Sequence, residues 1–132
     1  MNSNYNNNNN TQAAIDFTKP MYQDESVLAT MFRQINSKAE RGLGDHQIQA
    51  MSQLVLRNPS LLKQVAKPIK TYQFCLNLIM ENGMCLEFVP LELMDVEMAV
   101  FAMVQNIEAT QFVKDSIMDR VLEVYNVMCP AQ

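Results

Sequence analysis

Apolar residues recur every three or four positions in several stretches of the chain, which is the spacing of one face of an α-helix. The first such stretch begins with Asp24 as a capping residue, has an acid in its first turn, and carries basic residues before Gly42. These are the start and stop signals of a helix. We therefore predict one helix over residues 24–40. Its apolar face comprises Val27, Leu28, Met31, Phe32 and Ile35.

Beyond residue 46 the pattern repeats with a period of 24 residues. The segment that starts at Asn82 reads NGMCLEFVPLELMD, and the segment that starts at Asn106 reads NIEATQFVKDSIMD. Placing residues 47–71, 72–95, 96–119 and 120–132 in register aligns four sets of residues: Asn58, Asn82 and Asn106; Val65, Val89 and Val113; Ile69, Leu93 and Ile117; and Val55, Ile79, Met103 and Val127. A fixed period of this length is typical of stacked repeats.

Each repeat is predicted to begin with a long buried helix. Thr71, Asp95 and Asp119 each precede a ten-residue apolar stretch and are good N-cap residues for it. These stretches are apolar on several faces, as expected of a helix packed between neighbours. Alternation with a period of two is not sustained anywhere, so strands are not expected.

A shorter and more polar helix is predicted to follow in each repeat. Asn ends the long helix and starts the short one, and Pro59 takes the first helical position in the first copy. We expect the short helices to run through Val65, Val89 and Val113, with Pro90 stopping one of them. A last turn then brings Leu93 or Ile117 to the core.

One such pair cannot cover its own apolar face, so neighbouring pairs must stack. The predicted fold class is therefore all-α. It consists of stacked short helix pairs in a solenoid-like bundle, preceded by one longer N-terminal helix, in a single domain over residues 21–132.

Residues 1–20 are predicted to be a flexible tail, because seven of the first ten residues are Asn and apolar content is low. Ile15 and Phe17 are its candidates for docking on the domain or on a partner.

No signal-peptide pattern is present, and no apolar run approaches the ~20 residues that a membrane-spanning helix needs. Cys75, Cys85 and Cys129 form no C-x-x-C pair, which favours a reducing compartment such as the cytoplasm. Non-classical secretion into a host cell is still open.

Residues suited to catalysis are few. His46 is the only histidine, and it is expected to be an exposed residue in the first turn of a helix. The chain has no Ser-His-Asp set, no phosphate-binding glycine loop and no metal-ligand spacing. We therefore predict a protein that is not an enzyme and that holds no cofactor and no metal.

Charge is distributed unevenly along the chain. Residues 47–71 carry four bases and no acid, whereas residues 72–132 carry nine acids and two bases. Nucleic acids and anionic membranes repel an acidic surface, so neither is expected as a partner. The basic segment lacks the interleaved aromatic residues of a single-strand binder and is read as solvated charge.

The stretch ENGMCLEFVPLELMD, followed by another apolar helix, resembles the helical repeats called domain of unknown function 4116. The resemblance is good from Cys75 to Asp95 and weaker from Val96 to Asp119, where Ile107 replaces the glycine of the motif and Lys114 its proline. It implies an all-helical repeat fold found in proteins of intracellular bacteria, including secreted effectors, and of large viruses. It implies no activity and no catalytic residue.

The repeats contain many of the eleven methionines of the chain. Flexible Met side chains fill cores and also suit adaptable binding surfaces, and the acids beside them are either recognition groups or a solvated face. The candidate partner-binding residues are Met84, Glu87, Glu92, Met94, Glu108, Met118, Tyr125 and Met128.

The last long helix has no short helix after it, so its apolar side chains need a cover. We expect self-association or a protein partner at this end. The predicted function is a non-catalytic adaptor or inhibitor of a partner protein, including an enzyme whose access it would block. The alternative is a structural or self-assembling subunit of a larger complex.

Overall fold

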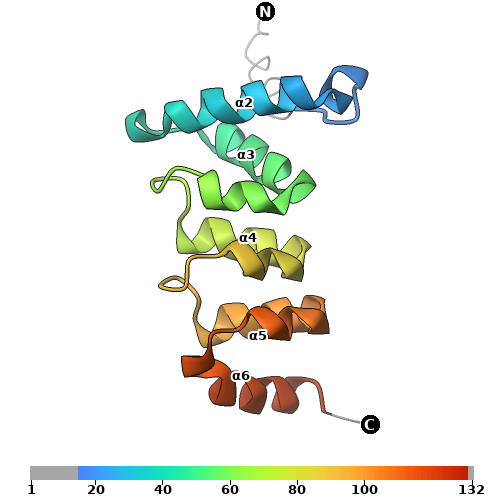
Figure 1. Ribbon diagram of the computed structural model, residues 1–132, viewed down its shortest axis with the longest axis vertical. Helices are drawn as coiled ribbons and strands as arrows, with labels where there is room; N and C mark the ends of the chain where they lie inside the picture. The colour runs from blue at the N-terminus through green and yellow to red at the C-terminus, as the bar shows by residue number, and fades with distance from the viewer. Residues whose placement is uncertain (1–14, 131–132) are drawn as a thin grey trace, which may run out of the picture. The chain divides into compact units, whose positions relative to one another are not determined.

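The computed structural model describes residues 15–130, and all regular secondary structure within them is helical (Figure 1). The predicted all-α class is confirmed. The elements in order are η2 (Pro20–Gln23), α2 (Glu25–Ser37), η3 (Ala39–Arg41), α3 (Asp45–Arg57), η4 (Pro59–Gln64), α4 (Tyr72–Glu81), η5 (Gly83–Phe88), α5 (Val96–Gln105), η6 (Ile107–Phe112) and α6 (Asp115–Met128), where η denotes a 3-10 helix.

The chain divides into two compact units, where the sequence predicted a single domain over residues 21–132. Unit 1 comprises the described residues up to Leu54 together with Ala66–Ile69, and unit 2 comprises Val55–Val65 and the residues from Lys70 onward. Helix α3 thus contributes its last three residues to unit 2. A stacked solenoid over the whole chain stays a prediction.

Unit 1 contains the predicted N-terminal helix. The Asp24 side chain accepts a hydrogen bond from the Ser26 N–H, which confirms the predicted cap, and the α-helical part ends at Ser37. Residues 15–19, assigned to the tail from sequence, form a turn in which the ring of Phe17 contacts that of Tyr22 at 5.3 Å. Pro20, the last residue of the predicted tail, begins η2, and residues 1–14 lie outside the described residues.

Unit 2 alternates α-helices with 3-10 helices, and Asn forms the junctions, as predicted. The N–H groups of Asn82 and Asn106 close α4 and α5 at 2.8 Å, and their side chains accept from the N–H groups of Met84 and Glu108. Both asparagines have an extended backbone, so the chain reverses at a single residue. Asn58 has a similar backbone, but its side chain accepts from the Ser60 hydroxyl instead.

Two of the three predicted caps of the long helices are confirmed. The Thr71 hydroxyl accepts from the Phe74 N–H at 3.1 Å, and the Asp95 carboxylate accepts from the Met98 N–H at 2.9 Å. The Tyr72 hydroxyl also donates to Asp95 at 3.0 Å. This bond joins the first residue of α4 to the cap of α5, so the starts of the two adjacent helices are held together.

The short helices differ from the prediction in type and in length. They are 3-10 helices of six residues that end just before Val65, Val89 and Val113, which are buried and extended. The end falls at the same position in the two copies that lack the proline, so Pro90 is not what stops η5. The less favourable hydrogen-bond geometry of 3-10 helices limits their length.

The last turn before α5 was also predicted with the wrong core residue. Met94 is buried there, with 2% of its surface exposed, whereas Leu93 is half-buried. The Met94 sulfur accepts from the Lys114 N–H at 3.4 Å, and the Lys114 ammonium donates to the Leu91 carbonyl at 2.8 Å. Lys114 therefore anchors the connection that precedes α6 to the turn that precedes α5.

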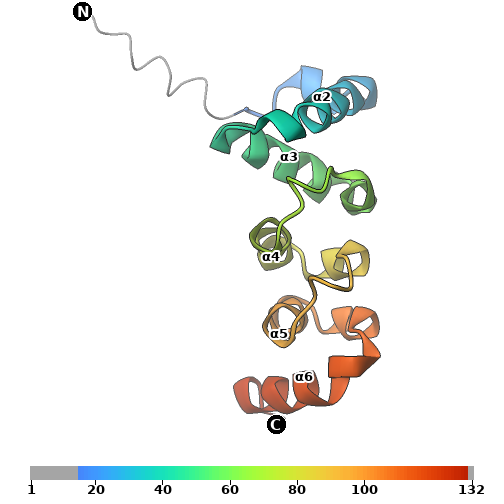
Figure 2. The ribbon, with the colours of Figure 1, turned by 90° about the vertical axis from the view of Figure 1, so that its left-hand side faces the viewer.

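Helix α6 begins at Asp115, not after a cap at Asp119, which lies exposed inside the helix. The helix dipole stabilises an acidic residue in the first turn, and Asp115 is such a residue. The equivalent positions of the two earlier repeats hold Lys67 and Leu91, which carry no negative charge. Figure 2 shows the consequence: α4 and α5 are seen end-on, whereas α6 is seen along its length. It therefore crosses α5 obliquely, and Ile117 becomes part of its half-buried face instead of a separate turn.

The side chain that meets the core also changes in α6. Positions 55, 79 and 103 are buried, yet the equivalent Val127 is 76% exposed. In α6 the fully buried residue is instead Val121. The equivalent positions of α4 and α5 hold Gln73 and Glu97, which are exposed. Polar Glu123 and Asn126 stand where α4 has the buried Cys75 and Leu78. The face of α6 that corresponds to the buried face of α4 is thus mixed in polarity.

Gly83 is required by the packing of η5 against α5. A Cβ atom at this position would collide with the carbonyl oxygen of Ala102 and would come within 3.2 Å of the Gln105 side-chain oxygen. That carbonyl is fixed, because it accepts from the Asn106 N–H. Gln105 in turn accepts from the Gly83 N–H at 2.6 Å and donates to the Glu81 carbonyl at 3.2 Å. Its amide therefore binds the end of α4 and the start of η5 together.

Gly83→Ala should lower the free energy of unfolding by about 2–3 kcal/mol, because the methyl group has no space beside Ala102. Ile107→Ala is the matched control, since Ile107 occupies the same position of η6 and is 52% exposed. Its effect should stay within about 0.5 kcal/mol. Urea denaturation followed by circular dichroism measures both. Equal effects of the two substitutions would contradict the packing role of Gly83.

Candidate functional site

The predicted partner-binding residues all lie in unit 2, but the structure does not gather them into one site. Met84 and Glu87 lie on η5, Glu92 in the turn after Pro90, and Glu108 on η6. Met84 and Glu108 occupy equivalent positions of η5 and η6, which pack side by side. The acids are exposed, and Met84 is half-buried. The other members of the set are Met94, Met118, Tyr125 and Met128.

Met94 is not available for contact with a partner, because it is buried in the core of unit 2. Met94 was a candidate for partner contact because acidic residues flank it in the sequence. The local sequence alone does not show which residue of the turn faces the core. Met118 and Tyr125 are half-buried on α6. Met128, at the end of α6, is exposed and lines the groove described next.

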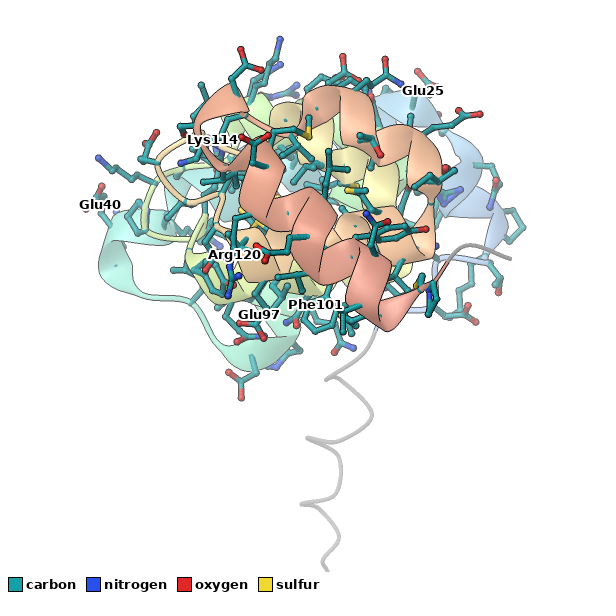
Figure 3. All side chains as sticks on the ribbon, turned by 90° about the horizontal axis from the view of Figure 1, so that it is seen from below. Glu25, Glu40, Glu97, Phe101, Lys114 and Arg120 are labelled. Carbon is teal, nitrogen blue, oxygen red and sulfur yellow. The ribbon has the colours of Figure 1, made fainter. Side chains whose placement is uncertain are left out.

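A groove of about 390 Å³ lies between α5 and α6. Most of its lining is apolar. The residues that form it are Val96, Glu97, Val100 and Phe101 from α5 and Arg120, Val124 and Met128 from α6. Figure 3 shows Glu97, Phe101 and Arg120 along the same side of α6. Both helices line the groove, and Val121 of α6, next to the lining residue Arg120 in sequence, is fully buried.

The charged side chains of the groove are one acid and one base. Arg120 forms an ion pair with Glu123 at 2.9 Å, with 66% of each side chain exposed. Such a pair contributes little to stability because both partners are solvated. The helices α5 and α6 together carry four acids, Glu97, Asp115, Asp119 and Glu123, against Arg120. Asp115 and Asp119 lie on the side of α6 turned away from the groove, so the charged side chains beside the groove are Glu97, Arg120 and Glu123.

Apolar side chains continue from the groove onto the outer face of α6. Val127 follows Val124 by three residues and Arg120 by seven, so it lies on the same side of the helix. It is the most exposed of the large apolar side chains within residues 15–130. Leu122, also exposed, lies on the opposite side of the helix. Val127, Met128 and the groove together form one continuous apolar surface with acidic neighbours.

Sequence analysis missed most of the groove. Phe101, Val96 and Val100 were read only as part of an apolar helix, and Arg120 was not singled out. One signal could have identified Phe101: its aromatic ring stands at the position that is a polar, exposed Asn77 in α4. A large apolar residue at an outward repeat position indicates either a neighbour or a binding surface.

The remaining candidate chemistry is structural. His46 is an exposed residue in the first turn of α3, as predicted. Within residues 15–130, no group of three or more His, Cys, Asp or Glu side chains could hold a metal ion, and none of the helices is long and apolar enough to cross a membrane. Burial, followed by the hydrogen bond to Asp95, raises the pKa of Tyr72 to about 12.

Cys75 and Cys85 are free thiols in the core, whereas Cys129 is half-buried. Burial raises the pKa of both core thiols from the usual 9.0 to about 11. A thiol with a raised pKa remains protonated near neutral pH and is a poor nucleophile or metal ligand. The two core cysteines therefore pack as small apolar side chains.

Comparison with known proteins gave no matching family model, no matching curated protein and no matching solved structure. The resemblance to domain of unknown function 4116 stays a prediction.

The raised thiol pKa values predict a loss of stability at alkaline pH. In the unfolded chain the thiols ionise above pH 9, whereas in the folded chain they stay protonated until about pH 11. The free energy of unfolding should therefore fall across this window by about 1.4 kcal/mol per pH unit for each thiol. Urea denaturation between pH 8 and pH 10.5 measures this slope.

Variants assign the slope to the core thiols. Cys75→Ala should remove about half of the thiol contribution to the slope, and the double variant Cys75→Ala/Cys85→Ala should remove all of it. Comparing slopes, and not absolute stabilities, separates this effect from the cost of the smaller side chain. An unchanged slope in the double variant would show that other groups cause the alkaline loss.

Proposed function

We propose that this chain is a non-catalytic protein–protein interaction module that acts as an adaptor or inhibitor of a partner protein. The observation that carries the proposal is the apolar surface formed by the groove between α5 and α6 with Val127 and Met128. A contiguous apolar surface with charged neighbours is typical of protein interfaces. The groove belongs to unit 2 alone, so the interaction needs only this unit.

The chemistry of the described residues is consistent with a binding role. The core thiols are protonated, and the charged residues of the groove are solvated, so the groove brings together no pair of acid and base suited to proton transfer. An inhibitor of this kind acts by occupying the surface that its target needs for another partner or for a substrate.

A second candidate function, a self-assembling structural subunit, has one observation in its favour. Leu122 and Val127 are exposed at repeat positions where the preceding helix, α5, has the buried Met98 and Met103. Within unit 2, another helix covers the equivalent positions. In this second candidate, a further copy of the chain would supply that cover.

One pair of variants tests the proposal and separates the two candidates. Val127→Asp places a charge on the apolar surface, whereas Leu91→Asp places one on an exposed residue of the turn between η5 and α5. For an adaptor or inhibitor, wild-type protein should be monomeric in light scattering. It should also capture a stoichiometric protein from a cognate lysate. Val127→Asp should abolish this capture, and Leu91→Asp should leave it unchanged.

The other outcomes identify the alternative or reject both. A wild-type dimer or larger assembly that Val127→Asp converts to monomers would favour the self-assembling subunit. A monomer whose captured proteins are unaffected by either variant would reject a binding role for this surface. Circular dichroism of both variants confirms that helix content is retained.

A further inference from the structure

We infer that Asn82 is a site of covalent self-modification by deamidation, and that the side chain of Gln105 suppresses this reaction while η5 stays packed against α5. The inference goes beyond the proposed function and does not depend on it. It joins two observations: the sequence Asn82-Gly83 at a helix junction, and the hydrogen bonds that Gln105 makes on both sides of that junction.

The chemistry of the site lies in the Asn-Gly sequence. The backbone nitrogen of Gly83, once it loses its proton, attacks the side-chain carbonyl carbon (Cγ) of Asn82. A C–N bond forms, the bond from Cγ to the side-chain nitrogen breaks, and that nitrogen leaves as ammonia with the proton that Gly83 lost. Water then opens the five-membered succinimide ring at either of its carbonyl groups. The products are aspartate and isoaspartate at position 82.

The three junction asparagines differ in how readily they can react. Asn58 precedes Pro59, whose nitrogen has no proton to lose. Asn106 precedes Ile107, whose branched side chain hinders the attack. Asn82 precedes glycine, which presents neither obstacle, and this is the only Asn-Gly sequence of the chain. The reactive junction is therefore the second of the three.

Packing requires glycine at this position, so the reactive sequence is built into the fold. A Cβ atom on Gly83 would collide with the carbonyl oxygen of Ala102. The junction in turn uses the Asn82 side chain, whose oxygen accepts from the Met84 N–H at 3.0 Å. The same two residues that join α4 to η5 are thus the two that react.

The folded backbone keeps the reacting atoms apart. Ring closure needs the Gly83 nitrogen to eclipse Cβ of Asn82, which occurs at a negative ψ, whereas Asn82 has a ψ of 102°. Rotation to that angle would carry Gly83 away from its place against Ala102, and the Asn82 oxygen away from the Met84 N–H. The reaction therefore requires local separation of η5 from α5.

Gln105 both holds this contact closed and protects the attacking nitrogen. Its side-chain oxygen accepts from the Gly83 N–H at 2.6 Å, and its side-chain nitrogen donates to the Glu81 carbonyl at 3.2 Å. A hydrogen bond from the neutral N–H group disfavours loss of its proton, because the anion would face the partial negative charge of the acceptor oxygen. Gln105 thus suppresses both steps that precede ring closure.

Deamidation would change the junction irreversibly. An aspartate at position 82 can still accept from the Met84 N–H, since Asp is a good capping residue. Isoaspartate instead carries the main chain through its side-chain carbon, so one additional carbon separates α4 from η5. Gly83 then no longer meets Ala102 and Gln105 in register. Local opening of this repeat would therefore be recorded as a permanent covalent change.

Peptide mapping by mass spectrometry tests the inference, because it gives the deamidation rate at each asparagine of the full chain. In native wild-type protein at mildly alkaline pH, position 82 should react about tenfold or more slowly than in the same protein unfolded in urea. Gln105→Ala should raise the native rate at position 82 about tenfold by removing both hydrogen bonds. It should leave the rate in urea unchanged.

Two further variants define the contribution of each bond. Gln105→Glu keeps an acceptor for the Gly83 N–H but cannot donate to the Glu81 carbonyl, so its native rate should lie between wild type and Gln105→Ala. Gln111→Ala is the matched control, since Gln111 is also exposed and donates to the Glu108 carbonyl within η6. It should leave the rate at position 82 unchanged.

A fourth variant separates local opening from global unfolding. Val121 is fully buried in α6 and takes no part in the hydrogen bonds of the Asn82 junction. Val121→Ala should lower the free energy of unfolding yet raise the rate at position 82 less than Gln105→Ala does. Urea denaturation followed by circular dichroism gives the stability of each variant and shows that it is folded in the rate measurement.

Several results would overturn the inference. Absence of reaction at position 82 in urea would reject the site, and equal rates in native and unfolded protein would reject its protection by the fold. An unchanged rate in Gln105→Ala would reject the role of this side chain. Acceleration that follows global stability alone, equally in Gln105→Ala and Val121→Ala, would assign protection to the whole unit instead of the junction.

Discussion

Unit 2 depends on a junction in which one asparagine ends an α-helix and starts a 3-10 helix. At Asn82 and Asn106 the backbone N–H completes the last turn of the α-helix, and the side-chain oxygen accepts from the N–H of the second residue of the next helix. Free N–H groups at a helix start are costly to bury without a partner. Because one residue satisfies both helix ends, the chain can reverse without a loop and bring each pair of helices together.

Close packing of these pairs then restricts what surrounds each junction. Gly83 lies against the Ala102 carbonyl, and the Gln105 amide spans the ends of α4 and η5. The Tyr72 hydroxyl and the Lys114 ammonium make further bonds to the neighbouring repeat. Each of these contacts joins residues 19–24 positions apart, so each helix pair is held by residues that follow it in the chain.

Helix α6 departs from the geometry of α4 and α5 and forms one side of the surface on which the proposed function depends. It starts one turn early, crosses α5 obliquely and turns Val121 inward, so that Val127 faces solvent (Figure 2). The groove beside α6 is lined by Phe101 and Met128 among other apolar residues, with Glu97 and Arg120 as its charged residues. The last helix of the described residues therefore forms one side of the proposed binding surface.

Sequence alone determined the class of the fold, the helical stretches, the Asn junctions and the caps at Asp24, Thr71 and Asp95. These features depend on hydrogen bonds and side-chain spacing within a few residues, which a single sequence reports directly. Tertiary structure decided the face that α6 turns to the core, the burial of Met94 in place of Leu93, the need for Gly83, and the groove at Phe101. Each of these depends on which neighbour a side chain meets, and that neighbour lies about 20 residues away or on another helix. Periodicity can align equivalent positions, but it cannot show that the last helix turns a different face to the core.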